Sequence, residues 1–88
     1  MPTISCFYGI IIRMRLGKNE HNPPHIHAYY QDDSAVFDLR TGEMTEGEMP
    51  NKQRKVVSAW VLLRQDELLA DWELAQSGEE PYKIEPLK

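Results

Sequence analysis

The chain has a single cysteine, Cys6, among its 88 residues. One cysteine cannot form an internal disulfide, so the disulfide-stapled frameworks of small secreted domains are excluded and a reducing compartment is favoured. Because free cysteine is among the most often buried residue types, we expect Cys6 to be a buried, inert thiol.

Long apolar runs are also missing. The longest early run, from Gly9 to Ile12, is far shorter than the roughly 20 residues that cross a bilayer. It also lacks the basic segment that precedes the apolar core of a signal peptide. We therefore expect a soluble, cytoplasmic protein that does not enter a membrane.

An excess of positive charge is missing as well, since 14 acidic residues outnumber 10 basic ones and the net charge is −4. Proteins that simply coat nucleic acid need a surplus of lysine and arginine, so that class is excluded, whereas a local basic patch is not. The chain also lacks a glycine-rich phosphate loop, a paired CxxC and a serine or cysteine nucleophile motif.

The residues that are present predict an α+β fold in one domain over residues 1–88, because this length suffices for one domain. We expect a small antiparallel sheet of three to four strands, followed by one kinked or two C-terminal helices packed on one of its faces. Residues 1–5 are expected to be a loose start. Period-two alternation and turn residues predict strands over residues 6–16, 25–30, 35–39 and 43–46.

Residues 51–76 carry an apolar stripe at helical spacing, with an interruption near Gln65 where we predict a break. Asn51 is predicted to cap the first helix, and Gly78 to stop the second. The tail, residues 79–88, is expected either to lie across the body or to hang free. The stripe predicts burial of Val57, Trp60, Val61, Leu68, Trp72 and Ala75.

All three histidines lie within seven residues, at His21, His25 and His27. The last two alternate with Ile26 on a predicted strand, so both imidazoles leave the same face, with Cα atoms about 6.6 Å apart at a rise of about 3.3 Å per residue. Such a pair can bind a phosphate. It can also coordinate a zinc or other transition-metal ion if His21 or Asp38 supplies a third ligand. The alternative is that the histidines are structural or solvated.

A turn at Asp32-Asp33 predicts a hairpin in which His27 lies directly opposite Asp38. A carboxylate beside an imidazole is the arrangement of an oriented general base. This pattern is compatible with a metal-independent ribonuclease, although cross-strand His–Asp pairs also occur simply as stabilising contacts. Its catalytic candidates are His25, His27 and Asp38, with Arg13 and Arg15 holding phosphate.

Three cations, Lys52, Arg54 and Lys55, crowd the start of the first predicted helix, where the helix dipole favours anions. They are candidates for clamping an anion or a nucleic acid at the helix N-terminus. The alternative is a solvated face, or surface pairing with Glu46 and Glu48, which stabilises little.

Several motifs together resemble the small bacterial domain-of-unknown-function family numbered 4160. The resemblance covers nearly the whole chain and implies a bacterial or phage cytoplasmic protein, often encoded beside a second small protein and associated with toxin–antitoxin pairs. It implies no established activity and no catalytic residues. The motifs are the Ile-Ile-Arg-Met segment at residues 11–14, Pro-Pro-His-Ile-His-Ala-Tyr-Tyr at 23–30, Thr-Gly-Glu at 41–43, Asp-Glu-Leu-Leu at 66–69, Trp-Glu-Leu-Ala at 72–75 and Lys-Ile-Glu-Pro-Leu at 83–87.

The leading hypothesis is a toxin–antitoxin-type component that acts through a small protein partner from a neighbouring gene. The helices or a free sheet edge would bind that partner. The alternatives are the metal-independent ribonuclease, for which RNA is the partner, and a histidine-based metal-binding module. No cofactor is expected outside the metal alternative, and a homo-oligomer is left open.

Overall fold

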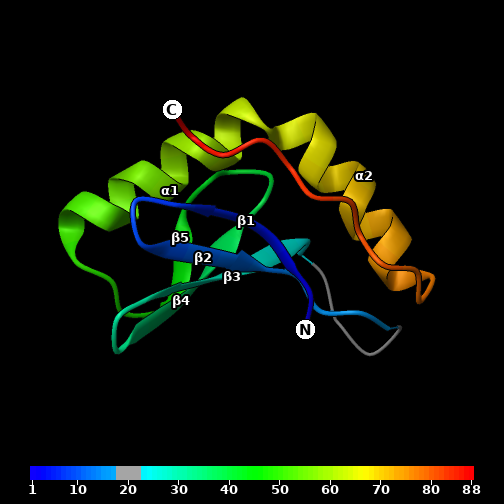
Figure 1. Cartoon of the computed structure of the whole chain (residues 1–88), viewed down its shortest axis with the longest axis horizontal. Coiled ribbons are helices and arrows are strands. Elements are labelled where there is room, and N and C mark those ends of the chain that lie inside the picture. Colours follow the sequence, from blue (N-terminus) through cyan, green and yellow to red (C-terminus); the bar gives the residue numbers. More distant parts are fainter. Residues whose placement is uncertain (18–22) are drawn as a thin grey trace.

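The computed structural model describes residues 1–17 and 23–88, which form a five-stranded sheet and two helices (Figure 1). The strands follow one another across the sheet in chain order, and every neighbouring pair is antiparallel. The expected α+β class is confirmed, but the sheet has five strands instead of three to four. The elements are β1 (Thr3–Phe7), β2 (Ile10–Arg13), β3 (His25–Tyr30), β4 (Asp33–Asp38), β5 (Met44–Gly47), α1 (Asn51–Leu63) and α2 (Gln65–Gln76).

The additional strand arises because a turn interrupts the first predicted strand, residues 6–16. Residues 3–13 form a hairpin of β1 and β2 instead. Tyr8 and Gly9 have φ angles of 50° and 77°, and they form a two-residue turn that reverses the chain between β1 and β2. Positive φ at both central positions matches the right-handed twist of the strands that such a turn joins. The prediction of a loose start over residues 1–5 was therefore wrong, and Tyr8 is 63% exposed at the turn.

The β3–β4 hairpin has a register two residues away from the predicted one. Tyr30 pairs with Asp33, so the turn lies at Gln31-Asp32, and Gln31 has a positive φ of 53°. A shift of two residues keeps every side chain on its predicted face, because side chains alternate with period two. It does change every cross-strand partner.

The two helices cover one face of the sheet and meet at Arg64, as the interruption near Gln65 predicted. Asn51 is the first residue of α1 and Pro50 precedes it, so the predicted asparagine cap was wrong; the Asn51 side chain accepts a hydrogen bond from Arg54 instead. The described helices include none that is long and apolar enough to cross a membrane. The predicted burial of the stripe is confirmed for all six residues: Val57, Trp60, Val61, Leu68, Trp72 and Ala75.

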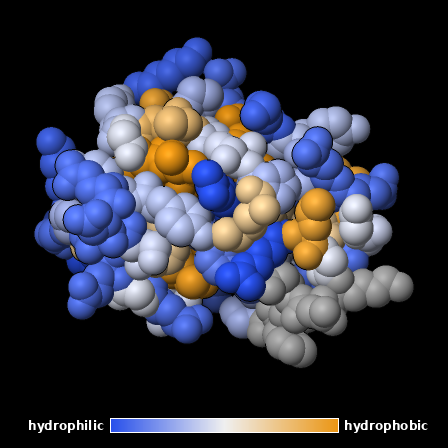
Figure 2. All heavy atoms as spheres, turned by 60° about the horizontal axis from the view of Figure 1, so that its bottom comes forward, coloured by the Kyte–Doolittle hydropathy of each residue, from blue (hydrophilic) through white to orange (hydrophobic). Residues whose placement is uncertain are grey.

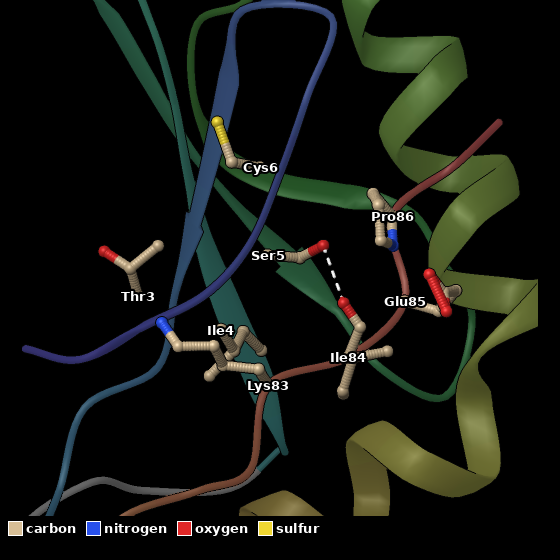
Figure 3. A pocket seen from close by; sticks show the side chains of 8 residues that line it. All are labelled: Thr3, Ile4, Ser5, Cys6, Lys83, Ile84, Glu85 and Pro86. Atoms are coloured by element: carbon tan, nitrogen blue, oxygen red, sulfur yellow. Dashed lines mark hydrogen bonds between the residues drawn. The ribbon is translucent and has the colours of Figure 1, made fainter.

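Residues 79–88 lie across the body, beside β1 (Figures 1 and 3). The Ile84 N–H donates to the Ile4 carbonyl at 2.8 Å, and the buried Ser5 hydroxyl donates to the Ile84 carbonyl at 2.9 Å. The tail and β1 border a cleft. The tail thus occupies the outer edge of β1, which would otherwise be open to another strand.

Cys6 is exposed, so the prediction of a buried thiol was wrong. Its neighbours Ser5 and Phe7 are buried, and alternation along an edge strand sends Cys6 to the opposite side. Figure 3 shows its sulfur pointing away from the tail.

Asp71, on α2, is only 3% exposed, and its Oδ1 accepts a 3.0 Å hydrogen bond from the Tyr82 backbone N–H. Its Oδ2 is buried without a hydrogen-bond donor among the described residues. Burial raises the pKa of the Asp71 carboxyl above 3.8, the Tyr82 hydrogen bond opposes that rise, and the charge of Glu67 adds to it.

Replacing Asp71 with asparagine is therefore expected to raise the free energy of unfolding at pH 7. The native state holds the proton more tightly than the unfolded chain does, so the stability due to this group is fully present below about pH 3.8 and is lost as pH rises through the native pKa. Asparagine keeps an acceptor for Tyr82 and carries no charge. Urea unfolding at pH 4 and pH 7 should show an advantage over the wild type that grows with pH.

Asp66→Asn, an exposed change on the same helix, is the control and should show no such gain. An Asp71→Asn protein that gains nothing at pH 7, or whose difference from the wild type is equal at both pH values, would contradict the assignment.

Candidate functional site

The candidate site lies on the face of the sheet opposite the helices, and it meets α2 at His25, beside Trp72. We call it the outer face and define it by the outward residues of β2 and β3: Ile11, Arg13, His25, His27 and Tyr29. All five are half-buried, and they alternate along their strands with fully buried core residues. Figure 2, in which the bottom of Figure 1 comes forward, shows hydrophobic and hydrophilic residues interspersed on this side.

His25 and His27 leave the same side of β3, as predicted. Their ring centroids are 5.3 Å apart and the rings meet edge to face, at 68°. Neither ring lies in the core, because both residues are half-buried while Ile26 between them has no exposed surface. The paired imidazoles therefore form part of one surface, as the alternation indicated.

The pairing of His27 with Asp38 was wrong. Val36 lies opposite His27, and Asp38 lies opposite His25. The Oδ1 of Asp38 also accepts hydrogen bonds from the backbone N–H groups of Arg40, at 2.7 Å, and Thr41, at 3.4 Å. Asp38 therefore stabilises the turn after β4, and the geometry does not place its carboxylate as the orienter of a general base at His27.

Arg13 is brought to the histidines by pairing of β2 with β3, which sets it directly opposite His27. Its Nε donates to the Thr3 hydroxyl at 3.2 Å, and its guanidinium carbon lies 5.5 Å from the centre of the Tyr29 ring. An arginine over an aromatic face gains a cation–π attraction, so its side chain is held in place from both sides. Thr3 and Tyr29 were missed as site residues, although alternation along β3 already puts Tyr29 on the side of His27.

His25 is positioned from two directions. Its Nδ1 lies 2.9 Å from the Pro23 carbonyl, and its ring centroid lies 5.1 Å from that of Trp72 on α2. A carbonyl only accepts, so Nδ1 must carry the proton, and a neutral His25 then presents Nε2 as an acceptor. The Pro24 carbonyl accepts a 2.9 Å hydrogen bond from the Leu39 N–H, which connects the segment before β3 to the residue that follows β4. No local sequence signal indicated the contact with Trp72, because it joins distant segments.

The metal alternative needed His21 or Asp38 as a third ligand, and His21 lies outside the described residues. Within residues 1–17 and 23–88, no group of three histidine, cysteine, aspartate or glutamate side chains could hold a metal ion. Two imidazoles alone are fewer than the three protein ligands of a catalytic zinc site. The described part of the chain therefore provides two of the three predicted histidines, His25 and His27, and no complete three-ligand site.

Three of the four other predicted cations lie in the helical layer. Arg15 is exposed and comes two residues after β2 ends. Lys52, Arg54 and Lys55 are exposed on the first turns of α1, in the helical layer on the opposite side of the sheet. The structure thus sets Arg13 opposite His27, and it places the three α1 cations in the layer on the other side of the sheet.

The second feature with functional potential is the β5 edge, defined by residues 43–48. β5 is the last strand of the sheet, and no described residue pairs with its outer side. Glu43, Glu46 and Glu48 are all exposed along it. An unpaired strand edge offers backbone groups to another chain, and this one carries negative charge.

Leu62 on α1 adds an apolar group beside this edge. It is 53% exposed, and a Cβ on Gly42 would lie 2.9 Å from its Cγ, so it packs on the turn that leads into β5. A single exposed leucine is common on protein surfaces, so the functional potential of this edge lies in the unpaired backbone of β5.

A family model described as "Domain of unknown function (DUF4160)" matches residues 9–73. The match spans the sequence from the first turn to α2, including the histidine pair, Arg13 and the β5 edge. No curated protein and no solved structure matches the chain.

Proposed function

We propose that this chain, which belongs to the family of domains of unknown function DUF4160, acts in the cytoplasm by binding a protein partner at the β5 edge, as one component of a toxin–antitoxin-type pair. The family resemblance of the sequence motifs supports a two-protein system, because it implies a second small protein encoded beside this one. The observation that supports β5 as the binding site is the difference between the two edges of the sheet.

At one edge, the tail already hydrogen-bonds to β1 through the Ile84 N–H. At the other, β5 ends the sheet without a described partner. A partner that adds a strand to β5 would gain main-chain hydrogen bonds, and alternate side chains would supply specificity.

Charge determines the kind of strand that fits. Glu43, Glu46 and Glu48 make the edge acidic, so a partner strand carrying lysine or arginine is favoured. Two copies of this chain pairing through β5 would bring the same glutamates together, and like charges on adjacent strands destabilise a sheet. The proposed partner is therefore a different protein with a basic strand and an apolar residue that reaches Leu62.

The test is co-expression of the chain with the product of the neighbouring gene, followed by purification through a tag on one protein. A stoichiometric complex is expected from the wild type. The double change Glu46→Lys and Glu48→Lys should weaken binding by about tenfold or more. Like charges brought together across an interface cost several kcal/mol, and about 1.4 kcal/mol corresponds to a tenfold change in affinity.

The matched control is Glu79→Lys with Glu80→Lys, which makes the same charge change at exposed positions after α2. It should leave the complex intact. Separate elution of the two wild-type proteins, or a complex that tolerates reversal at residues 46 and 48 as well as at 79 and 80, would refute the proposal.

A further inference from the structure

Arg13 makes no ion pair with any described residue, and neutral groups hold its side chain. Its contacts are a hydrogen bond to the Thr3 hydroxyl and the face of the Tyr29 ring. Arg64, by comparison, lies 3.3 Å from the Glu67 carboxylate. A half-buried guanidinium held by neutral groups keeps its charge available to an anion from outside the chain.

The carboxylates of the described residues do not neutralise this charge. The cross-strand row through Arg13 runs across His27 and Val36 to Glu46. Three strand spacings of about 4.8 Å put Glu46 some 14 Å from Arg13, beyond the screening length of about 8 Å at physiological salt. Asp38 is two strands from Arg13, and its Oδ1 already accepts two backbone N–H groups.

Among the described residues, the groups that surround Arg13 are flat rings. Tyr29 is beneath the guanidinium, His27 is directly opposite it, and the ring of His25 is 5.3 Å from that of His27. Arginine beside a row of aromatic and imidazole rings is the composition of surfaces that bind single-stranded nucleic acids: the cation contacts phosphate, while bases stack on the rings or on the guanidinium plane.

We propose that the outer face binds a single-stranded nucleic acid, with a phosphate at Arg13 and bases against Tyr29 and the imidazole pair. The face is independent of the β5 edge, so this inference stands or falls without the partner proposal. An extended ligand fits better than a free nucleotide, because the groups are spread along β2 and β3 on an open sheet face.

The net charge of the chain also predicts how strongly the binding depends on salt. At −4, the chain as a whole repels a polyanion, so the affinity must come from a local site. One or two phosphate contacts predict a salt slope of about −0.7 to −1.4 on a log–log plot, far shallower than for a basic nucleic-acid protein.

The test is fluorescence anisotropy of the full chain with labelled eight-residue RNA and DNA oligonucleotides at 50 and 200 mM salt. We expect Arg13→Gln to weaken binding about tenfold or more, and Tyr29→Leu to weaken it at least fivefold, because stacking contributes about 1–3 kcal/mol per base. Arg13→Lys should restore only part of the loss, since lysine keeps the charge without the planar fork.

Arg64→Gln is the matched control, because Arg64 is half-buried like Arg13 but lies where the two helices meet, with its guanidinium 3.3 Å from the Glu67 carboxylate. It should bind as the wild type does, within twofold. Circular dichroism and melting of each variant show whether the fold is kept. Tyr29→Leu tests the site by a second route should Arg13→Gln fail to fold.

Three outcomes would overturn the inference. The first is an absence of binding by the wild type at 50 mM salt. The second is equal loss in the Arg13→Gln and Arg64→Gln proteins, which indicates diffuse charge attraction. The third is equally tight binding of a duplex or of heparin, which indicates a general polyanion surface with no use for exposed bases.

Discussion

Replacing Gly47 with alanine is expected to lower the free energy of unfolding by about 3 kcal/mol or more. Gly47 has φ of 87°, a left-handed conformation that costs an L-residue about 1–2 kcal/mol. An added Cβ would also overlap the Ser34 carbonyl oxygen and lie 2.8 Å from the Ala35 Cα. Both neighbours are backbone, so relief requires β5 to move away from β4.

Gly78 provides a matched control, because its φ is 83° and nothing lies within 4 Å of the Cβ that alanine would add. Gly78→Ala should cost only the conformational part, about 1 kcal/mol. At roughly 4–8 °C per kcal/mol in a chain of this size, the melting temperatures of the two variants should differ by about 10 °C or more. Equal losses would mean that contact with β4 contributes nothing at Gly47.

Replacing Trp60 with alanine should cost about 3–5 kcal/mol, the largest loss that we expect from a core change. Trp60 has no exposed surface, its ring centroid lies 5.1 Å from that of Phe7, and its Nε1 donates to the Glu85 carbonyl at 2.9 Å. One side chain therefore joins α1, the first hairpin and the tail. A domain of this length has about 4–13 kcal/mol in total, so a large unfolded fraction is expected at 37 °C.

Trp60→Phe separates packing from the hydrogen bond. It keeps most of the apolar volume and removes the N–H, so we expect a loss of about 1–2 kcal/mol and earlier proteolysis at residues 79–88. Urea unfolding and timed digestion with mass spectrometry measure the two effects. A tail that resists protease in Trp60→Phe as well as in the wild type would show that the bond to Glu85 does not hold it.

The sheet face of each strand residue followed from the sequence, because side-chain direction depends on local backbone geometry. His25 and His27 were placed correctly on one side by alternation alone. The break between the helices was likewise marked by polar residues at 64 and 65 within an apolar stripe.

Pairing was where the sequence interpretation failed. Tyr8-Gly9 lacks the Asn-Gly or Asp-Gly signature of a tight turn, and a continuous apolar alternation concealed the hairpin. The β3–β4 hairpin is ambiguous in another way, because a register shift of two residues preserves every face. Positive φ at Gln31, which its residue type does not favour, accompanies the register that the fold adopts.

The candidate site was therefore half predictable. Alternation identified the two imidazoles and indicated Arg13, whereas Asp38 was assigned to the wrong histidine because its partner depends on register. Trp72 reaches His25 only through packing of α2, and no local pattern reports contacts between distant segments.

By itself, the sequence determined the α+β class, the helical stripe and the side of β3 from which both imidazoles project, since each depends on periodicities of the local backbone. Only the tertiary structure decided that Arg13 lies opposite His27, that the tail occupies the β1 edge and that the β5 edge remains open. Those features depend on which strands pair and in what register. Hydrogen bonding and packing between distant segments select that pairing from alternatives that have the same local pattern.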